Sequence, residues 1–236
     1  VLGQQAVAEQ SNEIAAIPDL LGLLDLRGAV VSIDAMGCQR AIAHTIIEAG
    51  GNYVLALKEN HPILCEEVRL WLDAEVARGH LPVLETLEKD HGRIEIRRYA
   101  LSHSIDWLEA KPDWAGLQAV GRVESTRLIG ESVSTEYRYF LCSLVEGDRF
   151  AAVVRSHWGI ENQQHWVLDV QFGEDACRTR RNHSAENLAV IRRMALNVLR
   201  HNGPVRDSLR RRKLRAALND AYRLRLLLGQ PNPATP

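Results

Sequence analysis

Two apolar runs with helical stretches around them restrict what the first third of this chain can fold into. Ala29–Ile33 and Tyr53–Leu57 are continuous apolar runs of the kind that is typical of strands buried in a sheet. Apolar residues recur with a helical period in three stretches around them: Glu13–Leu26, Arg40–Glu48 and Ile63–Ala77. Because strand and helix alternate, we predict an α/β fold for residues 1–81, with a further strand at Val1–Val7.

The composition of the chain changes beyond these elements. Three stretches rich in β-branched and aromatic residues follow, separated by polar links that contain Gly or Pro: Glu85–Ser102, Leu117–Ile129 and Glu136–Leu144. They predict a β-rich insertion over residues 82–148. The helical period returns at Phe150 and is strong in Ala185–Leu199, so residues 149–202 are expected to complete the core. Residues 203–236 are expected to form a basic C-terminal helix and a tail.

The charge of the chain is unevenly distributed. Its 236 residues include 29 basic and 30 acidic ones, which gives a formal net charge of −1. Arg178–Arg225 nevertheless carries 14 Lys and Arg residues against three acidic residues, so the rest of the chain is strongly acidic. A basic segment on an acidic body favours an anionic polymer as the partner. A solvated helical face balanced by the acidic body would give the same pattern.

The composition argues against a membrane protein and against a secreted one. No apolar run approaches the roughly 18 residues of a membrane span, and no signal peptide is visible. The four cysteines lack any Cys-x-x-Cys spacing. We therefore expect a cytoplasmic protein with reduced thiols.

Polar residues directly follow the two predicted strands. Asp34 comes after Ala29–Ile33, and ligands of open α/β sheets bind in the crevice beyond the ends of the strands. Asp34 is therefore a candidate ligand, although an Asp in this position can also cap the next turn or helix. Lys58–His61 follows the second strand and could reach the same crevice. Lys58 could contact phosphate there, or it could simply end the strand.

A second candidate tract lies far along the chain. His157, Glu161 and His165 are four residues apart, which places them on one face of a continuous α-helix, with Trp158 and Trp166 beside that face. A carboxylate on a strand and one on a distant helix suit a site for two divalent cations about 3.5–4 Å apart. A polar helix face in solvent, or a single-metal hydrolase that uses the two histidines and Glu161, would also fit this spacing.

Several words, in the same order and at similar distances, resemble a known family. They are Ser32–Gln39, Tyr53–Asn60, His91–Glu95 and His157–Val170. From about Val1 to Tyr222 the chain is similar to DDE-type insertion-sequence transposases of the ISAs type, the group that includes H-repeat-associated proteins. The resemblance implies a ribonuclease H-like core, α/β with a mixed sheet and flanking helices, that carries a β-rich insertion and is followed by basic C-terminal helices.

The resemblance also implies a set of three acids that hold two Mg²⁺ or Mn²⁺ ions. Asp34 matches the second acid and Glu161 the third. The first acid of the family belongs to an Asp-Gly-Lys word, and this chain contains no such word. Because the chain starts at Val1 rather than Met, we expect an N-terminally truncated product whose first acid and first strands lie upstream.

The function implied by the resemblance is that of the catalytic domain of a DNA transposase. It would cleave transposon ends in a Mg²⁺-dependent reaction and transfer the strand to target DNA, as a homodimer when active. The cations expected to contact DNA are Lys58, Arg155, His157, Arg178, Arg180, Arg181, Arg192 and Arg193. Because one metal ligand is missing from the chain, the alternative is a catalytically inactive DNA-binding remnant or a domesticated transposase-derived protein.

Overall fold

The computed structural model describes residues 13–90, 92–179, 181–204 and 206–229, without the side chains of Glu13, Asp90, Glu161 and Asn162. The chain divides between Trp158 and Gly159 into two compact units, each of which is described by itself below. The domain boundaries predicted from the sequence stay predictions. The predicted strand Val1–Val7 and the end of the predicted tail lie outside the described residues.

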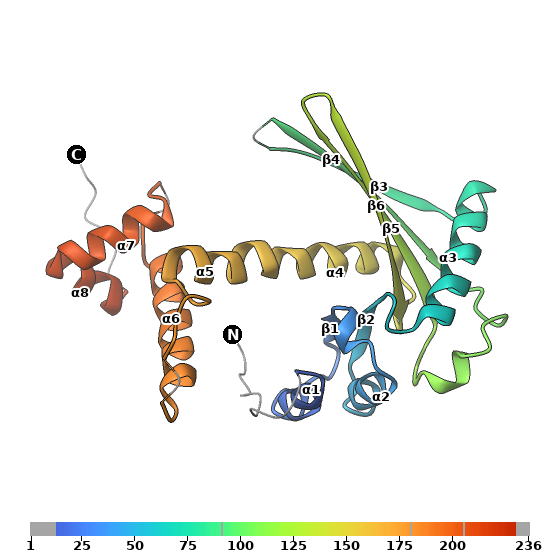
Figure 1. Ribbon diagram of the computed structural model, residues 1–236, viewed down its shortest axis with the longest axis horizontal. Helices are drawn as coiled ribbons and strands as arrows, with labels where there is room; N and C mark the ends of the chain where they lie inside the picture. Colours follow the sequence, from blue (N-terminus) through green and yellow to red (C-terminus); the bar gives the residue numbers. More distant parts are fainter. Residues whose placement is uncertain (1–12, 91, 180, 205, 230–236) are drawn as a thin grey trace. The chain divides into compact units, whose positions relative to one another are not determined.

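A mixed six-stranded sheet organises the described part of the first unit (Figure 1). Its strands are β1 (Val30–Ile33), β2 (Asn52–Leu57), β3 (Val83–Asp90), β4 (Arg93–Ser102), β5 (Ala119–Ile129) and β6 (Ser132–Cys142). Their order in the sheet is β1-β2-β6-β5-β4-β3, and only the pair β1–β2 is parallel. The strands predicted between residues 82 and 148 therefore extend the same sheet as β1 and β2. The predicted α/β class is confirmed.

The helices of this unit cover the two faces of the sheet near β2. They are α1 (Glu13–Gly22), α2 (Arg40–Glu48), α3 (Pro62–Ala77) and α4 (Gly147–Ile160). Side chains alternate between the faces of a strand, and β2 buries both sets. Tyr53 and Leu55 join the core with α2 and α3, whereas Val54 joins a second core with Phe150 and Val154 of α4. Burial on both faces explains why β2 is apolar from Tyr53 to Leu57.

A glycine in β5 allows α4 to approach the sheet closely. A Cβ atom at Gly121 would lie 2.5 Å from Cζ of Phe150, which is far inside van der Waals contact. Phe150 is fully buried, and its ring contacts Tyr99 and Phe140 edge-on, with centroids 6.4 and 5.6 Å away. The position of α4 therefore depends on the missing side chain at Gly121.

Arg40–Glu48 is confirmed as α2, but several other predicted elements differ from the observed ones. The stretch Glu85–Ser102 contains two strands, β3 and β4, and two helices stand where residues 203–236 were predicted to form one. The predicted helix Glu13–Leu26 ends earlier, at Gly22, because glycine weakens the helix and the next amides bond to carbonyls three residues back. The strand predicted as fully buried at Ala29–Ile33 is half-buried in β1. It lies at an edge of the described sheet and pairs with β2 alone.

The described part of the second unit is helical. A π-helical segment (Glu161–His165) leads into α5 (Trp166–Phe172), followed by α6 (Ser184–His201), α7 (Leu209–Leu218) and α8 (Asp220–Leu228). Helix α6 confirms the helix predicted at Ala185–Leu199. A small core of Leu199, Tyr222 and Leu226 joins α6 to α8. None of the helices in the described residues is long and apolar enough to span a membrane.

Substitution of Gly121 by Ala is expected to lower the free energy of unfolding by about 1–3 kcal/mol, because the new methyl group overlaps the Phe150 ring. Urea denaturation followed by tryptophan fluorescence measures this. The matched control is Gly147→Ala at the start of α4, where a Cβ would meet nothing within 4 Å. It is expected to change stability by less than about 1 kcal/mol. Equal stability of the two variants would contradict the close packing.

Candidate active site

Asp34 lies at the end of β1, with its side chain exposed. It caps a short 3-10 turn, Ala35–Gly37, where its Oδ1 atom accepts a hydrogen bond from the Gly37 amide at 3.4 Å. The capping role left open by the sequence is therefore real, but the contact is long. Within the described residues no other hydrogen bond or ion pair engages this carboxylate, so one oxygen remains available to a ligand.

Asn60 and His61, which follow β2, hold the loop after β1 in place. The Asn60 Nδ2 atom donates hydrogen bonds to the carbonyl oxygens of Ala35 at 2.6 Å and Cys38 at 3.3 Å. The Nε2 atom of His61 lies 2.8 Å from the same Cys38 oxygen. Lys58–His61 was predicted to reach this crevice from its position after the second strand, but the hydrogen bonds of Asn60 and His61 to the loop were not predicted.

The last turn of α4 lies beside β1. The Nδ1 atom of His157 is 3.1 Å from the Ser32 hydroxyl, two residues before Asp34, and the contact is partly buried. Glu161 follows His157 by four residues, but its side chain lies outside those that the structure describes. The proximity of Asp34 to Glu161 therefore stays a prediction.

Charged contacts fix α4 against the strands β3 and β4. Arg155 donates to Glu88 at 2.6 Å, and the same carboxylate accepts from Arg97 at 3.1 Å. Burial opposes the charge of Glu88, but the hydrogen bonds and charges of the two arginines lower its pKa overall. Arg155, predicted to contact DNA, thus has a protein partner in this structure.

The indole of Trp158 adds a second anchor to the end of α4. The guanidinium groups of Arg97 and Arg138 lie 4.9 and 4.6 Å from the centre of its ring. Arg97 is only 3% exposed and also pairs with Glu95 at 2.6 Å. These contacts attach the helix to β4 and β6 immediately before the division between the units.

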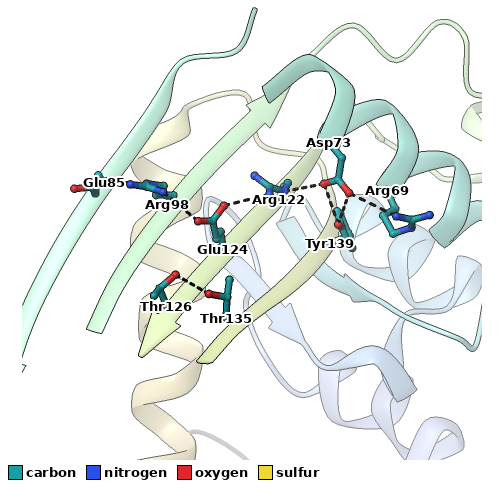
Figure 2. A network of polar contacts seen from close by, with 9 residues as sticks. All are labelled: Arg69, Asp73, Glu85, Arg98, Arg122, Glu124, Thr126, Thr135 and Tyr139. Atoms are coloured by element: carbon teal, nitrogen blue, oxygen red, sulfur yellow. Dashed lines mark hydrogen bonds and ion pairs between the residues drawn. The ribbon is translucent and has the colours of Figure 1, made fainter. Parts of the chain in front are cut away.

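A network of polar contacts crosses the other face of the sheet, from α3 to β3 (Figure 2). Asp73 is its centre: it pairs with Arg122 at 2.9 Å and accepts a hydrogen bond from the Tyr139 hydroxyl at 3.0 Å. Burial, and then the charge of Asp73, raises the pKa of Tyr139 to about 12. Glu124 continues the network from Arg122 towards β3. Because every charge in the network has a partner, we assign it to holding α3 against the strands.

The polar face predicted for His157, Glu161 and His165 is not continuous. It requires an unbroken α-helical period, and the π-helical segment Glu161–His165 interrupts that period. Within the described side chains, no three His, Cys, Asp or Glu residues gather closely enough to hold a metal ion. Asp34 is the candidate oxygen ligand that the described residues do provide, with one carboxylate oxygen uncommitted.

The C-terminal arginines predicted to bind DNA differ in their surroundings. Arg178 and Arg181 are exposed, and Arg180 lies outside the described residues. Arg193 lies 3.7 Å from the carboxylate of Glu174. Arg192 contacts the Cys177 thiol, and its hydrogen bond, with further ones at Thr179, lowers the thiol pKa to about 7. Lys58 is exposed at the end of β2.

Comparison with known proteins identifies the family of the chain. The family model of the transposase DDE domain matches residues 1–198. The chain therefore belongs to the transposase DDE domain family. No solved structure matches the chain.

Three relatives illustrate how far the similarity extends. The "putative transposase YncI" of Escherichia coli O157:H7 is 38% identical over 94% of this chain and 58% of its own length. The "H repeat-associated putative transposase YhhI" of Escherichia coli K12 is 36% identical over 97% of the chain and 62% of its own length. An "uncharacterized protein in dhlA 3'region" of Xanthobacter autotrophicus is 51% identical over 61% of the chain and 48% of its own length. The chain thus spans about half to three-fifths of these relatives.

Replacing Asn60 by Asp is expected to destabilise the first unit by about 0.5–1.5 kcal/mol, because a carboxylate would then face the carbonyl oxygens of Ala35 and Cys38. Asp34→Asn is the matched comparison. Its amide oxygen can still accept from the Gly37 amide, so stability should change by no more than about 0.5 kcal/mol. Urea denaturation checks both, and a stable Asn60→Asp variant would show that the tether is unimportant.

Proposed function

We propose that this chain forms part of the catalytic domain of a DNA transposase, in which Asp34 and Glu161 are two of the acids that hold divalent metal. The observation that carries the proposal is the family match over residues 1–198, together with a strand-end carboxylate at Asp34 that keeps an uncommitted oxygen. Carboxylate oxygens are the ligands that Mg²⁺ and Mn²⁺ prefer.

A histidine lies close to the strand that carries Asp34. The hydroxyl of Ser32, two residues before Asp34, is 3.1 Å from the Nδ1 atom of His157 in the last turn of α4. A π-helical segment begins at Glu161, and such segments occur often at functional sites.

The residues around Asp34 would orient it for this role. The Gly37 amide holds one carboxylate oxygen, and Asn60 and His61 fix the loop through backbone carbonyls. A ligand held by a fixed loop keeps its geometry better than one on a free loop. Two metal ions, when bound, would activate the attacking oxygen and stabilise the leaving oxygen of a DNA strand. Lys58, exposed after β2, would contact a phosphate of that strand.

The partner that this function requires is DNA, both at the transposon ends and at the target, and we propose a homodimer as the active form and the cytoplasm as its location. The basic segment Arg178–Arg225 supports the DNA partner, since its charge suits phosphates. This segment also supports a second candidate function. A protein that binds DNA without cleaving it would need the basic residues but not the acids.

Asp34→Asn is expected to reduce Mg²⁺-dependent cleavage of transposon-end DNA by at least about 100-fold, because it removes a metal ligand while the cap on the turn is kept. The assay is nicking of labelled end DNA by the natural protein that contains this sequence. The control, Asp106→Asn, neutralises an acid whose side chain is 95% exposed and paired with Lys111. Cleavage at the wild-type rate by Asp34→Asn would remove Asp34 from the site.

Binding of duplex DNA should depend strongly on salt, because contacts to phosphates release counterions. We expect the affinity to fall by at least about tenfold between 50 and 200 mM salt. Asp34→Asn should bind as the wild type does, since it changes no basic residue. Fluorescence anisotropy with a labelled duplex measures both effects. Binding that does not respond to salt would contradict a phosphate-binding role for the basic segment.

A further inference from the structure

Arg212 of the second unit binds the end of a helix. Arg212 is half-buried, and its guanidinium donates to the carbonyl oxygens of Leu199 at 2.8 Å, Arg200 at 3.2 Å and Asp207 at 2.9 Å. The carbonyls of the last turn of a helix have no partner within the helix. A cation at this end also interacts favourably with the negative end of the helix dipole. Arg212 therefore completes the C-terminal end of α6.

Many other basic residues of this unit also have partners within the unit. Arg215 pairs with Asp207 at 2.7 Å, and Arg223 pairs with Asp220 and donates to the Ala216 carbonyl at 3.0 Å. Further contacts to backbone or side chains engage these residues: Arg192, Arg193, Arg200 and Lys213. The charge of the segment is therefore larger than the charge that it can offer to a ligand.

Arg206, Arg210 and Arg211 are the exception around α7. All three side chains are exposed, and in the described part of the unit no hydrogen bond or ion pair holds their guanidinium groups. Arg210 and Arg211 lie in the first turn of α7, and Arg206 lies in the loop before it. Arg178 and Arg181 are also exposed, but they flank Arg180, which is not described.

The fold gives no reason for cations at Arg210 and Arg211. The first turn of α7 contains no acidic residue, and Ser208 already caps it by accepting from the Arg211 amide at 3.3 Å. Positive charge at the N-terminal end of a helix opposes the dipole and lowers stability. Local choices that cost stability without a compensating contact are expected at functional sites.

We propose that Arg210 and Arg211, together with Arg206, contact the phosphates of duplex DNA, whereas Arg212 holds the unit together and contacts none. This inference rests on the DNA partner proposed above and names the residues that recognise it. A guanidinium group binds two phosphate oxygens at once, so exposed arginines on one helical turn suit adjacent backbone phosphates.

The test compares variants of the full chain that each remove two positive charges. Arg210→Gln/Arg211→Gln should weaken binding to a mixed-sequence duplex about tenfold or more and reduce the salt slope by about 2. Its urea midpoint should stay the same or rise. Arg215→Gln/Arg223→Gln should lower the urea midpoint, because it removes the ion pair to the mostly buried Asp207 and the hydrogen bond to the Ala216 carbonyl, and should keep the salt slope.

A third variant, Arg212→Gln, should lower the urea midpoint and keep the salt slope as well. If the wild type binds DNA and Arg210→Gln/Arg211→Gln binds with the same affinity and salt slope, the assignment of these arginines is overturned. If the wild type itself shows no salt-dependent binding, the DNA partner fails, and this inference fails with it. The two failures are therefore distinguishable from the wild-type measurement alone.

Discussion

In the first unit, Ile33 of β1 pairs with Leu55 of β2 in parallel, so both strands end at the same edge of the sheet. That pairing brings the loop after β1 within reach of Asn60 and His61, which follow β2. The apolar pattern of β2 maintains the pairing, because β2 contributes to the cores on both faces. The position of Asp34 thus depends on the burial of the side chains of β2, the neighbouring strand.

The sequence predicted those features that a local pattern determines. The apolar run Tyr53–Leu57 was enough to predict β2. The apolar run Ala29–Ile33 was enough to predict that Asp34 follows a strand. The order of the strands was not predictable, because no local pattern in β6 indicates that it pairs with β2. The contacts of Asn60 and His61 were not predicted for a related reason: side chains that bind backbone carbonyls leave no complementary residue type in the sequence.

Two predictions from residue type and spacing went too far: the number of arginines available to a ligand, and the shared helix face of three residues. Arg211 and Arg212 are adjacent and identical in type, yet only Arg212 meets the open end of another helix. Spacing by four residues predicted one face for His157, Glu161 and His165, but a π-helical segment changes the period at that point. In both cases the outcome depends on contacts and backbone geometry that residue type does not encode.

We propose that Asp34 and Glu161 hold the same metal. The decisive measurement is calorimetry of Mn²⁺ binding to the natural protein and to its Asp34→Asn, Glu161→Gln and double variants. Residues that share a site show effects that do not add. We expect each single change to weaken binding and the double change to weaken it by much less than the sum of the two. Additive losses, or a single variant that binds Mn²⁺ as tightly as the wild type, would contradict it.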